Sequence, residues 1–193
     1  MKIVLASGSP RRFELLKMIG IKDFDVIADN SMEIMTPGLA PGDQVIRLSL
    51  QKARNVSRSC DKETLIIAAD TLVYLGEEPL GKPDSRQDAR MMLKSLSGRK
   101  HCVYTGVTLL MGDIQTSAAE KTDVYFRDIS DSEIDAYVET GEPMDKAGAY
   151  AAQSGAATFI ERIEGEFFNV MGLPLCRLSI MLKDFGVHYE SFN

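Results

Sequence analysis

The sequence predicts an α/β domain built on a mixed β-sheet. Short apolar or alternating runs predict strands, and segments with apolar residues three and four positions apart predict helices between them. Two strand-like runs, 101–111 and 114–126, are separated by Gly112-Asp113, which is typical of a hairpin. Hairpins combined with strand–helix units indicate a sheet with parallel and antiparallel pairs. The length, 193 residues, fits one domain covering 1–193.

The first half of the chain alternates predicted strands and helices. Residues 2–6 (KIVLA) predict a short buried strand, and a helix follows over 10–19. Residues 24–28 (FDVIA) alternate in polarity as a strand does. A loop rich in proline and glycine then precedes a helix over 43–58. Residues 64–75 (TLIIAADTLVYL) predict a long, mostly buried strand.

The second half carries several helix boundary signals. Ser85 suits the N-cap of a helix that follows it. Ser130 and Glu133, three residues apart, form a capping-box pattern ahead of another helix. Pro174 opens the last helix, and Gly186 ends it. These signals place helices around the predicted hairpin.

Composition excludes several classes of protein. The net charge of -6 argues against a nucleic-acid-binding protein, which usually carries a basic face. The apolar run within MKIVLASGSP is too short for a signal peptide or a membrane span. Three cysteines without a CxxC spacing favour reduced thiols and a cytoplasmic setting. The two histidines lie far apart, which excludes a histidine-rich metal site.

Residues 7–12 (SGSPRR) place two cations at a helix start. The helix dipole is already positive there, so Arg11 and Arg12 are unfavourable unless an anion binds. Free backbone N–H groups and the hydroxyls of Ser7 and Ser9 complete a phosphate cradle. The alternative is a surface helix whose arginines point to solvent. A nucleophilic serine is disfavoured because there is no G-x-S-x-G elbow.

Asp70 interrupts the apolar strand predicted over 64–75. A lone buried charge is unfavourable, so such a residue is usually paired, metal-bound or placed at a strand end facing a cleft. A catalytic or metal-binding role is one interpretation, and capping of the next turn is the other. Thr71 follows directly and points to the opposite face of a regular strand.

Four further polar residues stand out by their surroundings. Glu33 lies in a segment with few other charges, and Lys52 lies in the middle of a predicted helix, where a solvated face is the plainer interpretation. Lys82 is flanked by glycine and proline, which fix the backbone around it, although an ordinary loop lysine fits as well. Gln153 is the one large polar side chain after Tyr150 in a stretch of small residues. Its amide suits the reading of a base edge, and close packing is the alternative.

Taken together, six stretches resemble the Maf family, also called septum formation inhibitor proteins. The stretches are LASGSPRR (5–12), AADTLV (68–73), GKP (81–83), YTGV (104–107), GEPMDKAGAYAAQ (141–153) and FNVMGLPL (168–175). The resemblance implies an α/β fold with an elongated mixed sheet and two lobes around a central cleft. It also implies pyrophosphatase activity on nucleoside triphosphates, a divalent cation and a possible homodimer.

The resemblance also implies roles for single residues. Asp70 matches the proton acceptor, and the pair Arg11 and Arg12 matches the phosphate-facing arginines. Polar residues of the cleft are matched by Glu33, Lys52 and Lys82. Positions that set substrate choice in the branch acting on dTTP and UTP are matched by Arg12, Thr71 and Gln153.

The expected reaction is hydrolysis of dTTP or UTP between the α and β phosphorus atoms, in the cytoplasm, with neither nucleic acid nor membrane as partner. Mg²⁺ or Mn²⁺ would bridge phosphate oxygens and the carboxylates of Asp70 and Glu33. Phosphate ligands would be Ser7, Ser9, Arg11, Arg12, Lys52 and Lys82. Two alternatives stay open, namely a 7-methyl-GTP pyrophosphatase and a non-catalytic, nucleotide-binding regulator of cell division.

Overall fold

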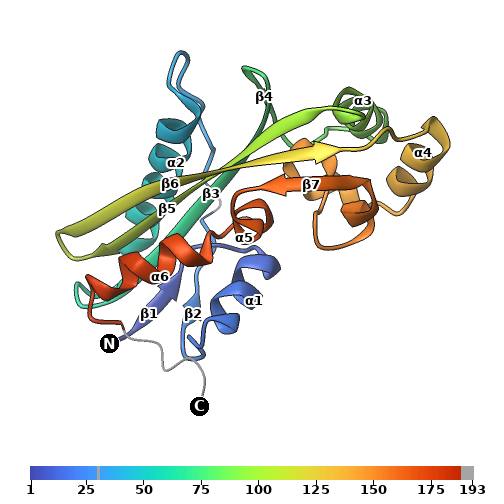
Figure 1. Cartoon of the computed structure of the whole chain (residues 1–193). Helices are drawn as coiled ribbons and strands as arrows, with labels where there is room; N and C mark the ends of the chain where they lie inside the picture. Colours follow the sequence, from blue (N-terminus) through green and yellow to red (C-terminus); the bar gives the residue numbers. More distant parts are fainter. Residues whose placement is uncertain (30, 188–193) are drawn as a thin grey trace. The chain divides into compact units, whose positions relative to one another are not determined.

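The computed structural model describes residues 1–29 and 31–187, which form a seven-stranded mixed sheet flanked by helices (Figure 1). The strand order is β2-β1-β3-β5-β6-β7, and β4 pairs with β3 off this path. The strands are β1 (Ile3–Leu5), β2 (Asp25–Val26), β3 (Leu65–Leu75), β4 (Glu78–Leu80), β5 (Lys100–Met111), β6 (Ile114–Phe126) and β7 (Ile160–Glu164). The pair β1–β3 is parallel and the pair β3–β4 is antiparallel, so the predicted mixed sheet is confirmed.

The α-helices alternate with these strands along the chain. They are α1 (Pro10–Met18), α2 (Pro41–Ser57), α3 (Arg86–Leu96), α4 (Asp131–Glu139), α5 (Phe167–Met171) and α6 (Leu175–Lys183). Three 3₁₀-helices are η1 (Glu142–Asp145), η2 (Ala147–Ala149) and η3 (Gly155–Phe159). Within the described residues, no helix is both long and apolar enough to span a membrane.

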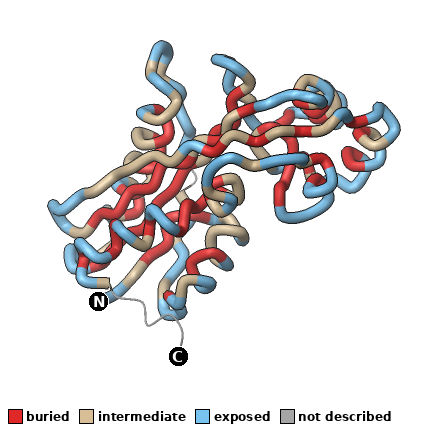
Figure 2. Tube along the Cα trace, viewed as in Figure 1, coloured by how far each residue is buried: buried red, intermediate tan, exposed pale blue. Residues whose placement is uncertain are grey.

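The described chain divides into two compact units. Unit 1 contains Met1–Asp70, Thr105–Glu120 and the described residues from Gly172 onward. Unit 2 contains Thr71–Tyr104 and Lys121–Met171. Each unit has its own apolar core, and Figure 2 shows buried residues along the central strands. The unit 1 core includes Val4, Ala53, Val56, Ile66 and Leu110, and the unit 2 core includes Leu93, Val103, Phe126, Ile134 and Phe159.

Helix α2 lies directly against β5 in unit 1. A Cβ built on Gly106 would come within 2.2 Å of the Val45 carbonyl oxygen, so only glycine allows this approach. Ser49 of α2 also shares a 2.8 Å hydrogen bond with Thr108 of β5. These contacts fix the helix on the sheet and thereby set the position of Lys52 further along it.

The caps follow the sequence signals, with one exception. Ser130 and Glu133 form the predicted capping box, and Ser85 accepts a hydrogen bond from the Asp88 N–H. Ser9 is the N-cap residue of α1, but its side chain makes no capping hydrogen bond. Its backbone N–H instead donates to Ser7 Oγ at 3.2 Å.

Two predicted boundaries were wrong by a few residues. The strand expected over 24–28 is only two residues long, because just Asp25 and Val26 pair with β1. The helix expected to begin at Asp43 begins at Pro41, since proline is well tolerated in a first turn. The predicted hairpin is confirmed, with β5 and β6 neighbouring and joined by Gly112-Asp113.

Candidate active site

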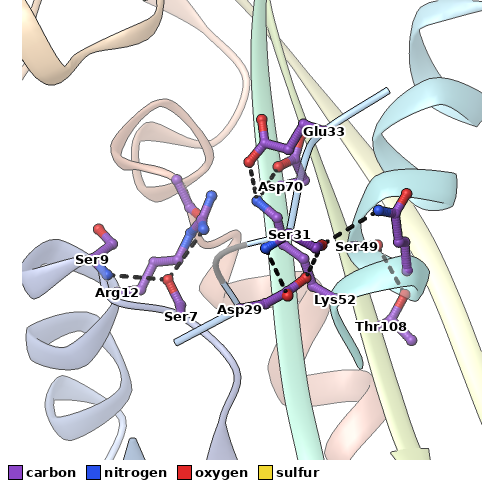
Figure 3. A network of polar contacts seen from close by, with 12 residues as sticks. Ser7, Ser9, Arg12, Asp29, Ser31, Glu33, Ser49, Lys52, Asp70 and Thr108 are labelled. Carbon is purple, nitrogen blue, oxygen red and sulfur yellow. Dashed lines mark hydrogen bonds and ion pairs between the residues drawn. The ribbon is translucent and has the colours of Figure 1, made fainter. Parts of the chain in front are cut away.

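Arg12 folds back over the junction between β1 and α1. Its Nη1 donates to Ser7 Oγ at 3.2 Å, and its Nε donates to the Gly172 carbonyl oxygen at 2.7 Å. Ser7 is buried, so the loop before α1 presents a fixed guanidinium (Figure 3). The alternative of an arginine simply pointing to solvent is therefore wrong for Arg12. Arg11 and Ser9 adjoin it on the same turn.

Lys52, from the middle of α2, bridges two carboxylates. Its Nζ lies 2.5 Å from Asp70 Oδ1 and 2.7 Å from Glu33 Oε1 (Figure 3). The Lys52 side chain is only 12% exposed, so the plainer interpretation of a solvated helix face is wrong. Three segments far apart in the sequence thus meet at one ammonium group within unit 1.

Asp70 lies in β3 and uses only one carboxylate oxygen within the described structure. Lys52 holds Oδ1, whereas Oδ2 is buried without a hydrogen-bond partner among the described residues. Burial raises the pKa of Asp70, although the positive charges of Lys52 and Arg12 act in the opposite direction. A buried carboxylate with one held and one unpartnered oxygen is suited to accept a proton or to bind a cation.

Glu33 belongs to a segment that side chains of α2 hold in place. We call this segment the strap; it consists of Asp29 and residues 31–36. Asn55 Nδ2 donates to Asp29 Oδ2 and to Ser31 Oγ, and further donations run from Gln51 to the Met32 carbonyl, from Arg47 to the Ile34 carbonyl and from the Thr36 N–H to Gln44. These contacts present Glu33 to Lys52.

Sequence reasoning missed the four residues of α2 that hold the strap. They are Gln44, Arg47, Gln51 and Asn55. Their spacing of three to four positions puts them on one face of α2 together with Lys52. This polar stripe at helical spacing is the sequence signal that could identify these residues.

The remaining predicted residues lie in unit 2. Thr71 follows Asp70 on β3, Lys82 lies in the loop after β4 and Gln153 lies between η2 and η3. Within unit 2, the Gly148 N–H donates to the Gly81 carbonyl at 3.0 Å, so the Lys82 loop and the segment leading to Gln153 touch. Lys82 is exposed and forms no ion pair within the described residues.

The Gln153 side chain is exposed in the described structure. The structure gives its amide no hydrogen bond with another described residue. The amide is therefore available to a ligand.

A divalent cation fits the donors of unit 1. Asp70 Oδ2 is an unpartnered buried oxygen, and Glu33 supplies a second carboxylate beside the same lysine. Among the described residues, no group of three or more His, Cys, Asp or Glu could hold a metal ion. This donor set suits Mg²⁺, which usually takes one or two carboxylates together with substrate phosphates and water.

A comparison with protein families decides the relationship. The family model described as "Maf-like protein" matches residues 2–185. The chain belongs to this family. The family match confirms the resemblance predicted from the six motif stretches of the Maf-like chain, which include SGSPRR and the strand that carries Asp70.

Three curated relatives of the Maf-like chain carry the same name. The Maf-like chain is 48% identical to the "dTTP/UTP pyrophosphatase" of Methanosarcina mazei, over 100% of this chain and 99% of the relative. The protein of the same name from Caldicellulosiruptor saccharolyticus is 45% identical, covering 96% and 95%. That of Bacillus anthracis is 41% identical, covering 96% of each chain.

Among solved structures, the Maf-like chain resembles the Staphylococcus aureus Ham1 protein and a HAM1 protein from Coxiella burnetii. Both comparisons give a TM-score of 0.53, at 15% and 14% sequence identity. They cover 96% and 95% of this chain and 100% and 99% of the others. The TM-scores indicate a shared fold, and sequence identities this low carry no conclusion about substrate.

Proposed function

We propose that this Maf-like chain is a nucleoside triphosphate pyrophosphatase that hydrolyses dTTP and UTP to the monophosphate and pyrophosphate. The observation that carries the proposal is the buried Asp70 carboxylate, with one oxygen held by Lys52 and the other unpartnered among the described residues. Its curated relatives at 41% to 48% identity are named dTTP/UTP pyrophosphatases, which supports the choice of substrate.

The proposed chemical step is attack of a water oxygen on the α phosphorus. Asp70 Oδ2 accepts the water proton as the new P–O bond forms. The bond from the α phosphorus to the bridging oxygen breaks, and pyrophosphate leaves with that electron pair. Lys52 keeps Oδ1 occupied, so the proton-accepting oxygen is defined. General-base assistance of this kind contributes about 10²–10⁴ in rate.

The cations at the start of α1 would bind the triphosphate. Arg12 is fixed by Ser7 and Gly172, and Arg11 adds a second guanidinium on the same turn. Backbone N–H groups and Ser9 at this helix start supply further donors. We assign Lys52 and Lys82 to the same task of stabilising charge on the leaving pyrophosphate.

Asp70 and Glu33 are the residues that would hold Mg²⁺ or Mn²⁺. When bound, such an ion polarises phosphoryl oxygens and neutralises developing charge. The ammonium of Lys52 lies between the two carboxylates in the described structure and shields their mutual repulsion.

We assign base selection to Arg12, Thr71 and Gln153. Thymine and uracil present an acceptor O4 beside a donor N3–H, and one amide side chain complements both. Adenine and cytosine present the reverse polarity. Selection by polarity requires the Gln153 amide to keep one orientation, so we expect that orientation to be fixed in the complex with the base, although the side chain is exposed in the described structure.

The proposal includes a homodimer in the cytoplasm with nucleotides as partners and without a role for nucleic acid or membrane. The three cysteines form no disulfide, which supports a reducing compartment. Sedimentation of the purified chain measures the oligomeric state directly, and a single monomeric species would remove the dimer from the proposal.

A nucleotide panel tests the function. Pyrophosphate release is followed with dTTP, UTP, CTP, dATP, ATP and 7-methyl-GTP, each with Mg²⁺ and with Mn²⁺. We expect dTTP and UTP to lead, and ¹⁸O from labelled water to enter the monophosphate. Turnover of 7-methyl-GTP alone, binding without turnover, or label in inorganic phosphate would each overturn the proposal.

A further inference from the structure

Tyr137 and Glu142 form a hydrogen-bonded pair in unit 2, in which Tyr137 is buried and Glu142 is partly exposed. Tyr137 projects from α4, is 6% exposed, and donates its hydroxyl hydrogen to Glu142 Oε1 at 2.6 Å. The Tyr137 ring packs edge-on against Phe159 at 5.4 Å. Neither residue belongs to the phosphate or metal ligands described above.

This pair holds both ends of the short segment 151–155, which we call the Gln153 segment. At one end, the Ala151 N–H donates to the Tyr137 hydroxyl oxygen at 3.2 Å. At the other end, Ser154 Oγ donates to Glu142 Oε1 at 2.8 Å. Gln153 is therefore the exposed residue of a segment whose backbone is tied down on either side.

Close packing strengthens this restraint. A Cβ on Gly155 would lie 2.9 Å from Tyr137 Cε2, so the segment lies directly against the ring. Upstream, Ala149 is buried with φ of 60°, a backbone conformation that non-glycine residues adopt only when the surroundings impose it. The backbone that leads into the Gln153 segment is thus held in a conformation that it would not adopt alone.

The protonation states keep the pair in this arrangement near neutral pH. Burial raises the pKa of Tyr137, and its hydrogen bond to Glu142 adds to the rise, so the phenol stays a donor. Burial also opposes the charge on Glu142, but hydrogen bonds from Tyr137, Ser154 and the Gly155 backbone hold the pKa of Glu142 below its ordinary value. A phenol donor and a carboxylate acceptor therefore coexist.

We propose that Tyr137 and Glu142 are positioning residues for base selection: they fix the Gln153 segment so that its amide meets a pyrimidine carrying O4 and N3–H. This inference rests on the proposed function and deepens it. An exposed glutamine on a free loop would lose more conformational entropy on binding, and a prearranged backbone reduces that loss. The pair contacts no reacting atom and acts only through Gln153.

Removal of one hydroxyl group tests the inference. Tyr137→Phe keeps the ring and deletes both hydrogen bonds, and we expect the dTTP-to-dATP ratio of kcat/KM to fall about five- to tenfold. The fall should come from a higher KM for dTTP, whereas kcat for dATP stays within about twofold. Tyr125→Phe is the matched control because Tyr125 donates to Glu164 at 2.8 Å on β6 and β7, and its ratio should not change.

A double-mutant cycle identifies the route of the effect. If Tyr137 acts through Gln153, the ratio of the double variant Tyr137→Phe/Gln153→Ala equals that of Gln153→Ala alone. Ser154→Ala cuts the other tie at an exposed position and should lower the ratio without endangering the fold. Glu142→Gln retains an acceptor oxygen and should preserve more selectivity than Glu142→Ala.

The failures of the two proposals are distinguishable. A wild-type chain without pyrophosphatase activity on dTTP and UTP overturns the proposed function itself. A selective wild-type chain overturns the positioning role in either of two cases. One is an unchanged ratio in Tyr137→Phe and Ser154→Ala, and the other is strict additivity with Gln153→Ala. An equal loss in Tyr125→Phe would also overturn it, because the effect would then be a general consequence of losing a tyrosine hydroxyl.

Discussion

At the scale of a single residue, the two carboxylate oxygens of Asp70 have different surroundings. Lys52 holds Oδ1 at 2.5 Å, and Oδ2 has no hydrogen-bond partner within the described residues. An ionised carboxylate buried without compensation is unfavourable, so the lysine stabilises the charge. The same lysine fixes which oxygen remains available for chemistry.

Replacement of the Asp70 carboxylate by an amide tests whether Oδ2 acts as the proton acceptor. Asp70→Asn retains the volume and a hydrogen-bond acceptor for Lys52, but it removes the proton-accepting oxygen. We expect kcat on dTTP to fall at least about a hundredfold, the low end for loss of a general base. Steady-state pyrophosphate release measures the fall, and near-normal turnover would contradict the assignment.

The matched control is another lysine-paired aspartate. Asp123 lies 3.2 Å from Lys100 and 3.0 Å from Lys121 in unit 2, and Asp123→Asn should leave kcat close to that of the wild type.

Wild-type turnover should also depend on pH in a definite direction. Burial raises the pKa of Asp70 above 3.8, so activity is lost on acidification at a higher pH than for an ordinary aspartate. Turnover constant down to pH 4 would argue against Asp70 as the base.

At the scale of elements, α2 organises unit 1 with two of its faces. One face meets β5, where Gly106 lets the Val45 backbone approach and Ser49 bonds to Thr108. Another carries Lys52 together with the polar residues that hold the strap. A single helix therefore contacts β5, the Asp70 carboxylate of β3 and Glu33.

Loss of one strap contact should weaken metal use. Asn55→Ala removes hydrogen bonds to Asp29 and Ser31, at 3.2 and 3.0 Å. With Glu33 held less firmly, we expect the Mg²⁺ concentration for half-maximal activity to rise about three- to tenfold. Maximal turnover should change little, because Lys52 and Asp70 are untouched. Magnesium titrations of the initial rate measure this shift.

Helix α2 offers its own control for that experiment. Arg54 neighbours Asn55 and donates to Gln115 of β6 at 3.2 Å, away from the strap. Arg54→Ala should leave the magnesium dependence unchanged. If both variants respond alike, the effect belongs to the stability of α2 and the strap has no separate role.

At the scale of the whole molecule, buried polar groups make stability depend on pH. His101 is 1% exposed in the unit 2 core, shares a 2.8 Å hydrogen bond with the Tyr150 hydroxyl and packs against Phe126 at 4.9 Å. Burial lowers the pKa of His101 from 6.5 to about 4. The folded chain therefore keeps this imidazole neutral where the unfolded chain protonates it.

The sign of the effect follows from that difference. The contribution of neutral His101 to the free energy of unfolding is complete above pH 6.5 and is lost as the pH falls toward 4. The loss is up to about 1.4 kcal/mol per pH unit and about 3 kcal/mol in all. His101→Gln should remove this slope. Tyrosine fluorescence during urea unfolding mainly reports on unit 2, because five of the six tyrosines lie in it. Equal slopes in wild type and variant would refute the assignment.

The sequence predicted the elements whose signals are local. A long apolar run located β3, Gly112-Asp113 located the hairpin, and Ser130 with Glu133 located a helix start. The extent of β2 was missed because pairing with β1, and not the alternation in residues 24–28, determines where a strand ends. Pairing is a non-local property, and strand propensity yields to it.

The candidate site was predictable as a set of residue types and less so as a geometry. A charge inside an apolar strand singled out Asp70 from burial alone. The pairing of Lys52 with two carboxylates was not foreseen, because it depends on how α2 rests on β5. The exposure of the Gln153 side chain could not be predicted from its sequence neighbours alone.

The boundary between the two compact units falls inside one strand, after Asp70 and before Thr71. The proposed base thus belongs to unit 1, whereas two of the three residues assigned to base selection, Thr71 and Gln153, belong to unit 2. Each unit has its own core, so mutations that alter the proposed base selection in unit 2 need not disturb the packing beneath the proposed catalytic carboxylate. Such a chain can diversify its substrates over evolution while its hydrolytic chemistry is inherited intact.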